Sequence, residues 1–222
     1  MKSILQIFLL FGLQIVFKTI YCSRGDTMTI DKNDMLNSIL SSLSKIDYIK
    51  PEEIPGIDLY MDQVTTFMDA KLASSKRHES DKILTKTMIN NYAKNDLLPP
   101  PVKKKYSREH MLALIFIYYF KNILSITDLQ ALFKPLEDKF FHAQSGISLT
   151  DIYNEVFSME KEQTEQLKAN IAETFSAARQ TFTDAPEDER ERLQIFSFIC
   201  LLSFDVYMKK QIIEKLIDDM NE

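Results

Sequence analysis

Apolar residues along this chain recur mainly at the spacing of an amphipathic helix, and the alternating runs typical of strands are nearly absent. Met35, Ile39 and Leu43 begin the pattern, and Pro51 and Pro55 interrupt it. The pattern therefore predicts an all-α protein. Further helices are expected over residues 57–72, 86–95, 108–123, 126–135, 149–182 and from 187 onwards, the last two forming a helical hairpin or the end of a bundle.

Polar residues at several of these starts are typical of helix N-caps. Thr85 and Ser107 each precede an apolar helical pattern, while Ser125 and Ser148 are each followed three residues later by an aspartate, as in a capping box. The run 111–120 is apolar throughout but only about half as long as a membrane span, so we expect it at the centre of a core. Residues 140–146 are interpreted as a linker.

The N-terminal segment allows three interpretations. Lys2 precedes an apolar run over residues 4–17, which is short for a membrane span and is followed by no small-residue cleavage site. Residues 1–27 are therefore an extension from a misassigned start upstream of Met28, a membrane anchor or a cleaved signal. The predicted domains are this extension, an N-terminal domain over 28–146 and an acidic helical module over 147–222.

Charge is distributed very unevenly along the 222 residues. The net charge is −5, yet residues 71–108 hold ten basic and three acidic residues, whereas residues 151–222 hold eight basic and sixteen acidic ones. A basic segment inside an acidic protein indicates an anionic partner, with a solvated charged face as the plainer alternative. Four glycines and no tryptophan argue against a barrel or a phosphate-cradling loop.

The sequence gives little sign of a metal site or a catalytic site. Cys22 and Cys200, with three scattered histidines, lack the spacing of a metal site, and Cys200 sits in an apolar run typical of a reduced core thiol. No pattern of nucleophile, base and orienting group stands out. We therefore expect no enzyme activity, no cofactor and no metal, and a cytoplasmic location, with membrane anchoring through residues 4–17 as the alternative.

The basic segment contains a candidate recognition helix and a candidate wing. On the helix 86–95, a packing face leaves polar residues pointing outward, and asparagine can pair with adenine while lysine pairs with guanine or phosphate. The helix candidates are Lys86, Thr87, Asn90, Asn91, Tyr92 and Lys94, of which Tyr92 fits the core better although its hydroxyl could reach a phosphate. The phosphate-binding candidates beyond the three prolines 99–101 are Lys103, Lys104, Lys105, Tyr106 and Arg108. Arg108 and His110 oppose the dipole of the next helix, which favours an anion at its start.

These residues resemble the DNA-binding domain of MerR-type regulators. The likeness rests on Tyr92, Lys94, Leu97-Leu98-Pro99 and Tyr106-Ser107, with residues 61–64 placed in the first helix of the helix-turn-helix and 112–133 resembling the paired helices that follow. The connection 73–83 is longer than the family's turn, and the C-terminal hairpin differs from its single long helix. More closely, residues 57–64 and 84–110 are similar to a bacterial family, domain of unknown function 1836, over roughly residues 50–150.

The resemblance implies a MerR-like winged helix-turn-helix followed by a C-terminal helical module. The expected function is a sequence-specific transcriptional regulator that binds double-stranded DNA. A homodimer is expected because a two-helix hairpin cannot cover the apolar faces of residues 193–204 alone. The alternative is a non-enzymatic interaction module, tethered to a membrane or not, whose basic segment binds an acidic protein or anionic lipid.

Overall fold

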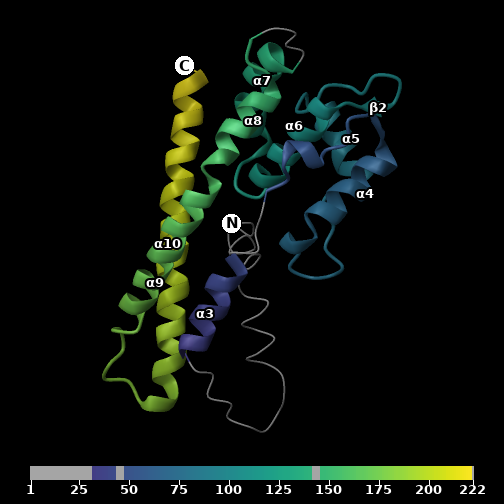
Figure 1. Cartoon of the computed structure of the whole chain (residues 1–222). Coiled ribbons are helices and arrows are strands. Elements are labelled where there is room, and N and C mark those ends of the chain that lie inside the picture. Colours follow the sequence, from purple (N-terminus) through teal and green to yellow (C-terminus); the bar gives the residue numbers. More distant parts are fainter. Residues whose placement is uncertain (1–31, 44–47, 142–145, 222) are drawn as a thin grey trace.

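The computed structural model describes residues 32–43, 48–141 and 146–221, and in this part of the chain the fold is almost entirely helical, as predicted (Figure 1). Only two short strands and two 3-10 turns interrupt the helices described. The elements are α3 (Lys32–Leu43), η1 (Pro51–Glu53), β1 (Leu59–Tyr60), α4 (Met61–Lys71), η2 (Ala73–Ser75), α5 (Lys86–Lys94), β2 (Lys105–Tyr106), α6 (Arg108–Phe120), α7 (Ile126–Phe140), α8 (Leu149–Ser158), α9 (Glu160–Ala178) and α10 (Glu187–Asn221).

Helix α6 lies at the centre of the larger core. Nine consecutive residues, from His110 to Tyr118, are buried, which confirms the expectation for this apolar run. Aromatic rings gather on one side of it, where Phe116 lies 5.3 Å from the ring of Tyr153 and 5.7 Å from that of Phe157, both on α8. The Tyr153 hydroxyl donates a 2.6 Å hydrogen bond to the Ile49 carbonyl, so α8 also fixes the chain entering this core.

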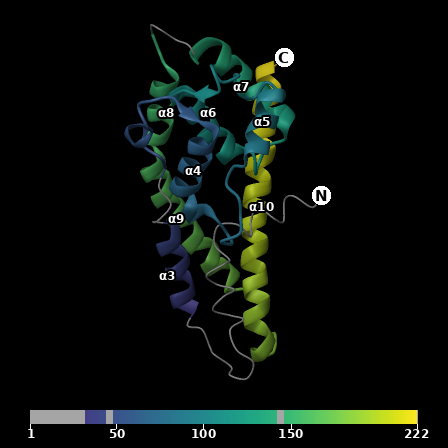
Figure 2. The same cartoon turned by 90° about the vertical axis from the view of Figure 1, so that its right-hand side faces the viewer.

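A second, smaller core joins the two ends of the chain. Met35 of α3 is buried with Ile171 and Phe175 of α9 and Phe198 of α10. Helices α9 and α10 run side by side in both views, with α3 packed against α9 (Figures 1 and 2). The other end of α10 packs on α7, and Lys210 donates a 2.8 Å hydrogen bond to the carbonyl of Ile123, in the turn before α7, so α10 links the two cores.

Two predicted helix ends are wrong. Helix α7 continues through Pro135 to Phe140, because buried Leu129 and Phe133 hold it and Pro135 sits on the exposed side, where the lost backbone hydrogen bond is tolerated. The long helix predicted over 149–182 divides at Met159, because α8 packs on α6 whereas α9 packs on α10 and α3. Phe182 lies beyond α9, with a φ of 53° and its side chain exposed.

Three further expectations need adjustment. The helix expected from residue 57 begins at Met61, because residues 59–60 pair as a strand. Phe141, placed in a linker, is buried with its ring 4.8 Å from that of His110. Leu149 and Tyr153, assigned to the C-terminal module, pack in the larger core.

The expectations for residues 1–27, including the anchor at 4–17, lie outside the described residues. Among the helices described, none is both long enough and apolar enough to cross a membrane. The thiol of Cys200 is free and half-buried.

Candidate nucleic-acid interface

Helix α5 presents a polar face outward, with the start that its sequence predicts. The Thr85 hydroxyl accepts a 3.2 Å hydrogen bond from the Met88 N–H, and Ile89 and Tyr92 are buried beneath the helix. The residues that point outward and are exposed are Lys86, Thr87, Asn90, Asn91 and Lys94. The outward asparagines leave their amide groups available to a base edge.

The predicted wing is a tight turn, Val102–Lys105, called here the lysine turn. The Lys105 N–H donates to the Val102 carbonyl at 2.9 Å, and φ is 51° at Lys103 and 64° at Lys104. Two consecutive left-handed residues are typical of a type I′ turn, where Asn-Gly is favoured. Lysine in this conformation costs roughly 1–2 kcal/mol per residue, which local packing does not explain because both side chains are exposed.

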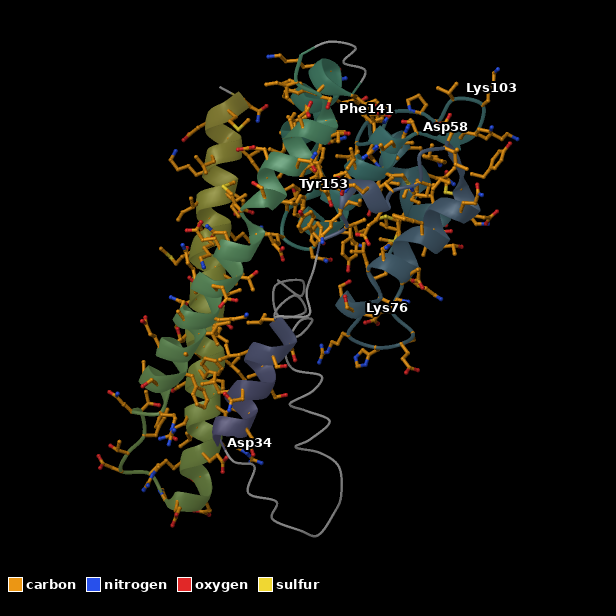
Figure 3. The ribbon with its side chains drawn as sticks, viewed as in Figure 1. Asp34, Asp58, Lys76, Lys103, Phe141 and Tyr153 are labelled. Carbon is orange, nitrogen blue, oxygen red and sulfur yellow. The ribbon has the colours of Figure 1, made fainter. Side chains whose placement is uncertain are left out.

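The lysine turn is anchored by a strand pair that the sequence pattern did not reveal. In antiparallel register, Tyr106 pairs with Leu59 and Lys105 pairs with Tyr60. The Lys105 ammonium lies 5.4 Å from the centre of the Tyr60 ring, and Tyr60 is itself 53% exposed. Figure 3 shows Lys103 at the outer edge of the molecule, on the side away from α9 and α10.

The start of α5 and the lysine turn meet around the first turn of α4. Lys86, the first residue of α5, forms an ion pair with Asp62, two residues after Tyr60. Both side chains of the pair are more than half exposed. The Asp62 carboxylate therefore neutralises one lysine of the basic surface.

Three of the predicted contact residues are engaged inside the protein. Tyr92 and Tyr106 are 6% and 3% exposed, and burial raises the pKa of both phenols. Arg108 is half-buried and donates a 3.0 Å hydrogen bond to the Pro51 carbonyl. The core and η1 hold these three side chains, and their contact with a ligand stays a prediction.

The start of α6 is also satisfied internally. The Ser107 N–H donates a 3.0 Å hydrogen bond to His110 Nδ1, which closes a capping box at the start of α6. The Ser107 hydroxyl lies between His110 Nδ1 and the Glu109 carboxylate, to which it donates at 2.7 Å. The Ser107 N–H is therefore satisfied within the protein, and the anion expected at this helix start stays a prediction.

The α4–α5 connection (residues 72–85) is tied down by side chains that sequence reasoning did not single out. The Ser75 and Tyr118 hydroxyls are hydrogen-bonded, and the Lys121 ammonium donates to the Ile83 carbonyl at 2.7 Å while lying 4.8 Å from the Tyr118 ring centre. Burial lowers the pKa of Lys121 to about 8. Since Ile83 lies two residues before the cap of α5, Lys121 sets where that helix begins.

Comparison with known proteins gives one match, over the central part of the chain. Residues 49–156 match a family described as Domain of unknown function (DUF1836). No curated protein and no solved structure matches the chain. The matched residues run from η1 into α8 and include α5 and the lysine turn, whereas α3, α9 and α10 lie outside the match.

Lys121 gives a testable pH dependence of folding. Its pKa is about 8 in the folded chain and about 10.4 when unfolded, so the unfolded chain binds more protons between these values. The stability of the wild type should therefore rise from about pH 8 to 10.4 relative to Lys121→Met, by about 3 kcal/mol. Urea unfolding at several pH values measures the difference, with Lys139→Met on the exposed side of α7 as the control. If the difference in free energy of unfolding between the wild type and Lys121→Met stays constant from about pH 8 to 10.4, the lowered pKa of Lys121 is contradicted.

Proposed function

We propose that this protein is a sequence-specific transcriptional regulator that binds double-stranded DNA through α5 and the lysine turn. The observation that carries the proposal is the meeting of α5's outward polar face and the lysine turn around Tyr60 and Asp62. A short helix with exposed asparagines suits the edges of bases in the major groove, while lysines at a protruding turn suit phosphates.

We further propose a winged helix-turn-helix of MerR type. The order β1, α4, α5, β2, α6 supports it, with the lysine turn as the wing. The α4–α5 connection is longer than a common helix-turn-helix turn, and the Lys86–Asp62 pair brings the start of α5 beside the first turn of α4. The angle at which α5 enters the groove therefore differs from that of a tight helix-turn-helix.

One observation favours a second candidate, an anionic protein or lipid surface. Val102, 66% exposed, stands beside Lys103 at the lysine turn, and an apolar side chain among lysines suits a lipid interface. Selection of bound sequences from random DNA, using the full chain, separates the two candidates. Enrichment of a defined motif supports the regulator, whereas equal affinity for all sequences together with binding to anionic vesicles supports the second candidate.

The lysine turn offers a test that separates folding from binding. Lys103→Asn combined with Lys104→Gly installs the residues that a type I′ turn prefers, so the free energy of unfolding should increase by about 2–3 kcal/mol, because glycine removes the whole cost at one position and asparagine part of it at the other. The same change removes two phosphate contacts, so affinity for every DNA sequence should fall and the salt slope should flatten by about 1.8 units. Urea unfolding measures the change in stability. Fluorescence anisotropy of labelled DNA across a salt series measures the affinity and the salt slope. Lys209→Gln with Lys215→Gln on α10 is the matched charge control, and an equal loss there argues against the turn.

Base readout is tested on α5. Asn90→Ala or Asn91→Ala should cost about 1–3 kcal/mol at one base position of the selected motif and leave non-specific binding unchanged, because each removes only an outward amide. Competition binding with single-base variants of the motif provides the measurement. Asn154→Ala, at an exposed position on α8, serves as the control. A uniform loss over all motif variants would exclude base contact.

Asp62 should act against DNA binding. Asp62→Asn removes the carboxylate and releases Lys86, so affinity for all sequences should rise and the salt slope should steepen by about 0.9 units. The same anisotropy series measures it, with Asp219→Asn on α10 as the control because that carboxylate also pairs with a lysine. Unchanged affinity would place Asp62 and Lys86 outside the interface.

A further inference from the structure

Helix α10 has an apolar side that no described element covers. We call it the outer face and define it by six large apolar residues whose spacing places them on one side of the helix. They are Phe196 (60% exposed), Leu201 (38%), Phe204 (65%), Tyr207 (48%), Met208 (59%) and Ile212 (58%). Phe198 and Ile217, on the opposite side, are buried in the smaller and the larger core. The intramolecular packing of α10 is therefore complete without the outer face.

The outer face is large enough for a stable protein interface. A fully exposed side chain of this size has roughly 200 Å² of accessible surface. At the exposures given, the six residues together present roughly 650 Å², close to the 800 Å² or so that each partner buries in a standard interface. Flanking polar side chains contribute the remainder. Contiguous apolar patches of this size usually mark sites of protein association.

The rim of the outer face is compatible with a second copy of the same surface. Lys209 pairs with Asp205 at 2.8 Å and Lys215 pairs with Asp219 at 2.9 Å, so these charges are already compensated within each helix. A parallel alignment would bring Asp218 and the negative C-terminal end of α10 beside their own copies. An antiparallel alignment separates them and opposes the helix dipoles, which is the favourable arrangement.

We propose that the outer face of α10 binds the outer face of a second copy of this chain, antiparallel and about a two-fold axis near Phe204 and Met208. Such an isologous contact closes after two copies, because each surface is used once. This inference is independent of DNA binding, since the lysine turn lies on the other side of the molecule (Figure 3).

Sedimentation equilibrium of the full-length chain tests the association. The wild type should show twice the monomer mass, with a mass that depends on concentration. Phe204→Glu places a charge at the centre of the interface and should raise the dimer dissociation constant by roughly a hundredfold. Ile147→Glu, at a position 61% exposed outside the outer face, is the matched control and should leave the constant unchanged. A monomeric wild type at every soluble concentration, or a dimer unaffected by Phe204→Glu, would overturn the proposal.

Photo-crosslinking identifies what covers the face and in which direction. A crosslinker at Ile212, in an equal mixture of isotopically labelled and unlabelled full-length chains, should yield mixed-isotope products joined near Cys200 and Phe196. Mixed products joined near Ile212 itself indicate a parallel pair and overturn the proposed arrangement. Products confined to one isotope and joined to residues 4–17 would show that the apolar N-terminal run of the same chain covers the face instead.

Discussion

The burial of α6 is the constraint on which the larger core depends. An apolar helix with nine consecutive buried residues needs partners on every side, and elements distant in the sequence supply them. The aromatic rings that contact Phe116 come from α7 and α8, and Tyr48 stacks on Phe157 of α8, so α8 is an integral part of this core. This explains why the matched family region extends to residue 156 although the candidate interface ends near residue 105.

The two ends of α6 position the two parts of the candidate interface. At its start, Arg108 holds η1 through the Pro51 carbonyl, and β2 immediately precedes the helix, so the lysine turn is fixed there. At its end, Lys121 and Tyr118 hold the α4–α5 connection and hence the cap of α5. A rigid helix thus sets the separation between the polar face of α5 and the lysines, as the proposed binding to DNA grooves would require.

Local signals predicted much of this arrangement, because capping and helical periodicity act within a few residues. Thr85 caps α5 and Ser148 caps α8, as expected. The Lys86–Asp62 pair and the pairing of Tyr60 with Lys105 were beyond local reasoning, because they join residues separated by 24 and 45 positions in the sequence. Lys103 and Lys104 are left-handed without the Asn-Gly pair typical of their turn type, so the sequence did not indicate this turn. Tyr92 and Tyr106 are buried because their largely apolar rings pack in the same core as α6.

The basic and acidic segments that are separate along the sequence are also separate in the fold. The basic segment holds α5 and the lysine turn, while α9 and the acidic first turn of α10 lie on the other side of the molecule (Figure 1). An anionic ligand at the lysine turn therefore meets little repulsion from these helices, because exposed charges more than about 10 Å apart are largely screened at physiological salt. The lysines flanking the outer face of α10, Lys209 and Lys215, are each paired with an aspartate of the same helix, so no uncompensated positive charge of theirs opposes association. Segregation of charge thus permits one chain to present a basic surface and an apolar surface without either weakening the other.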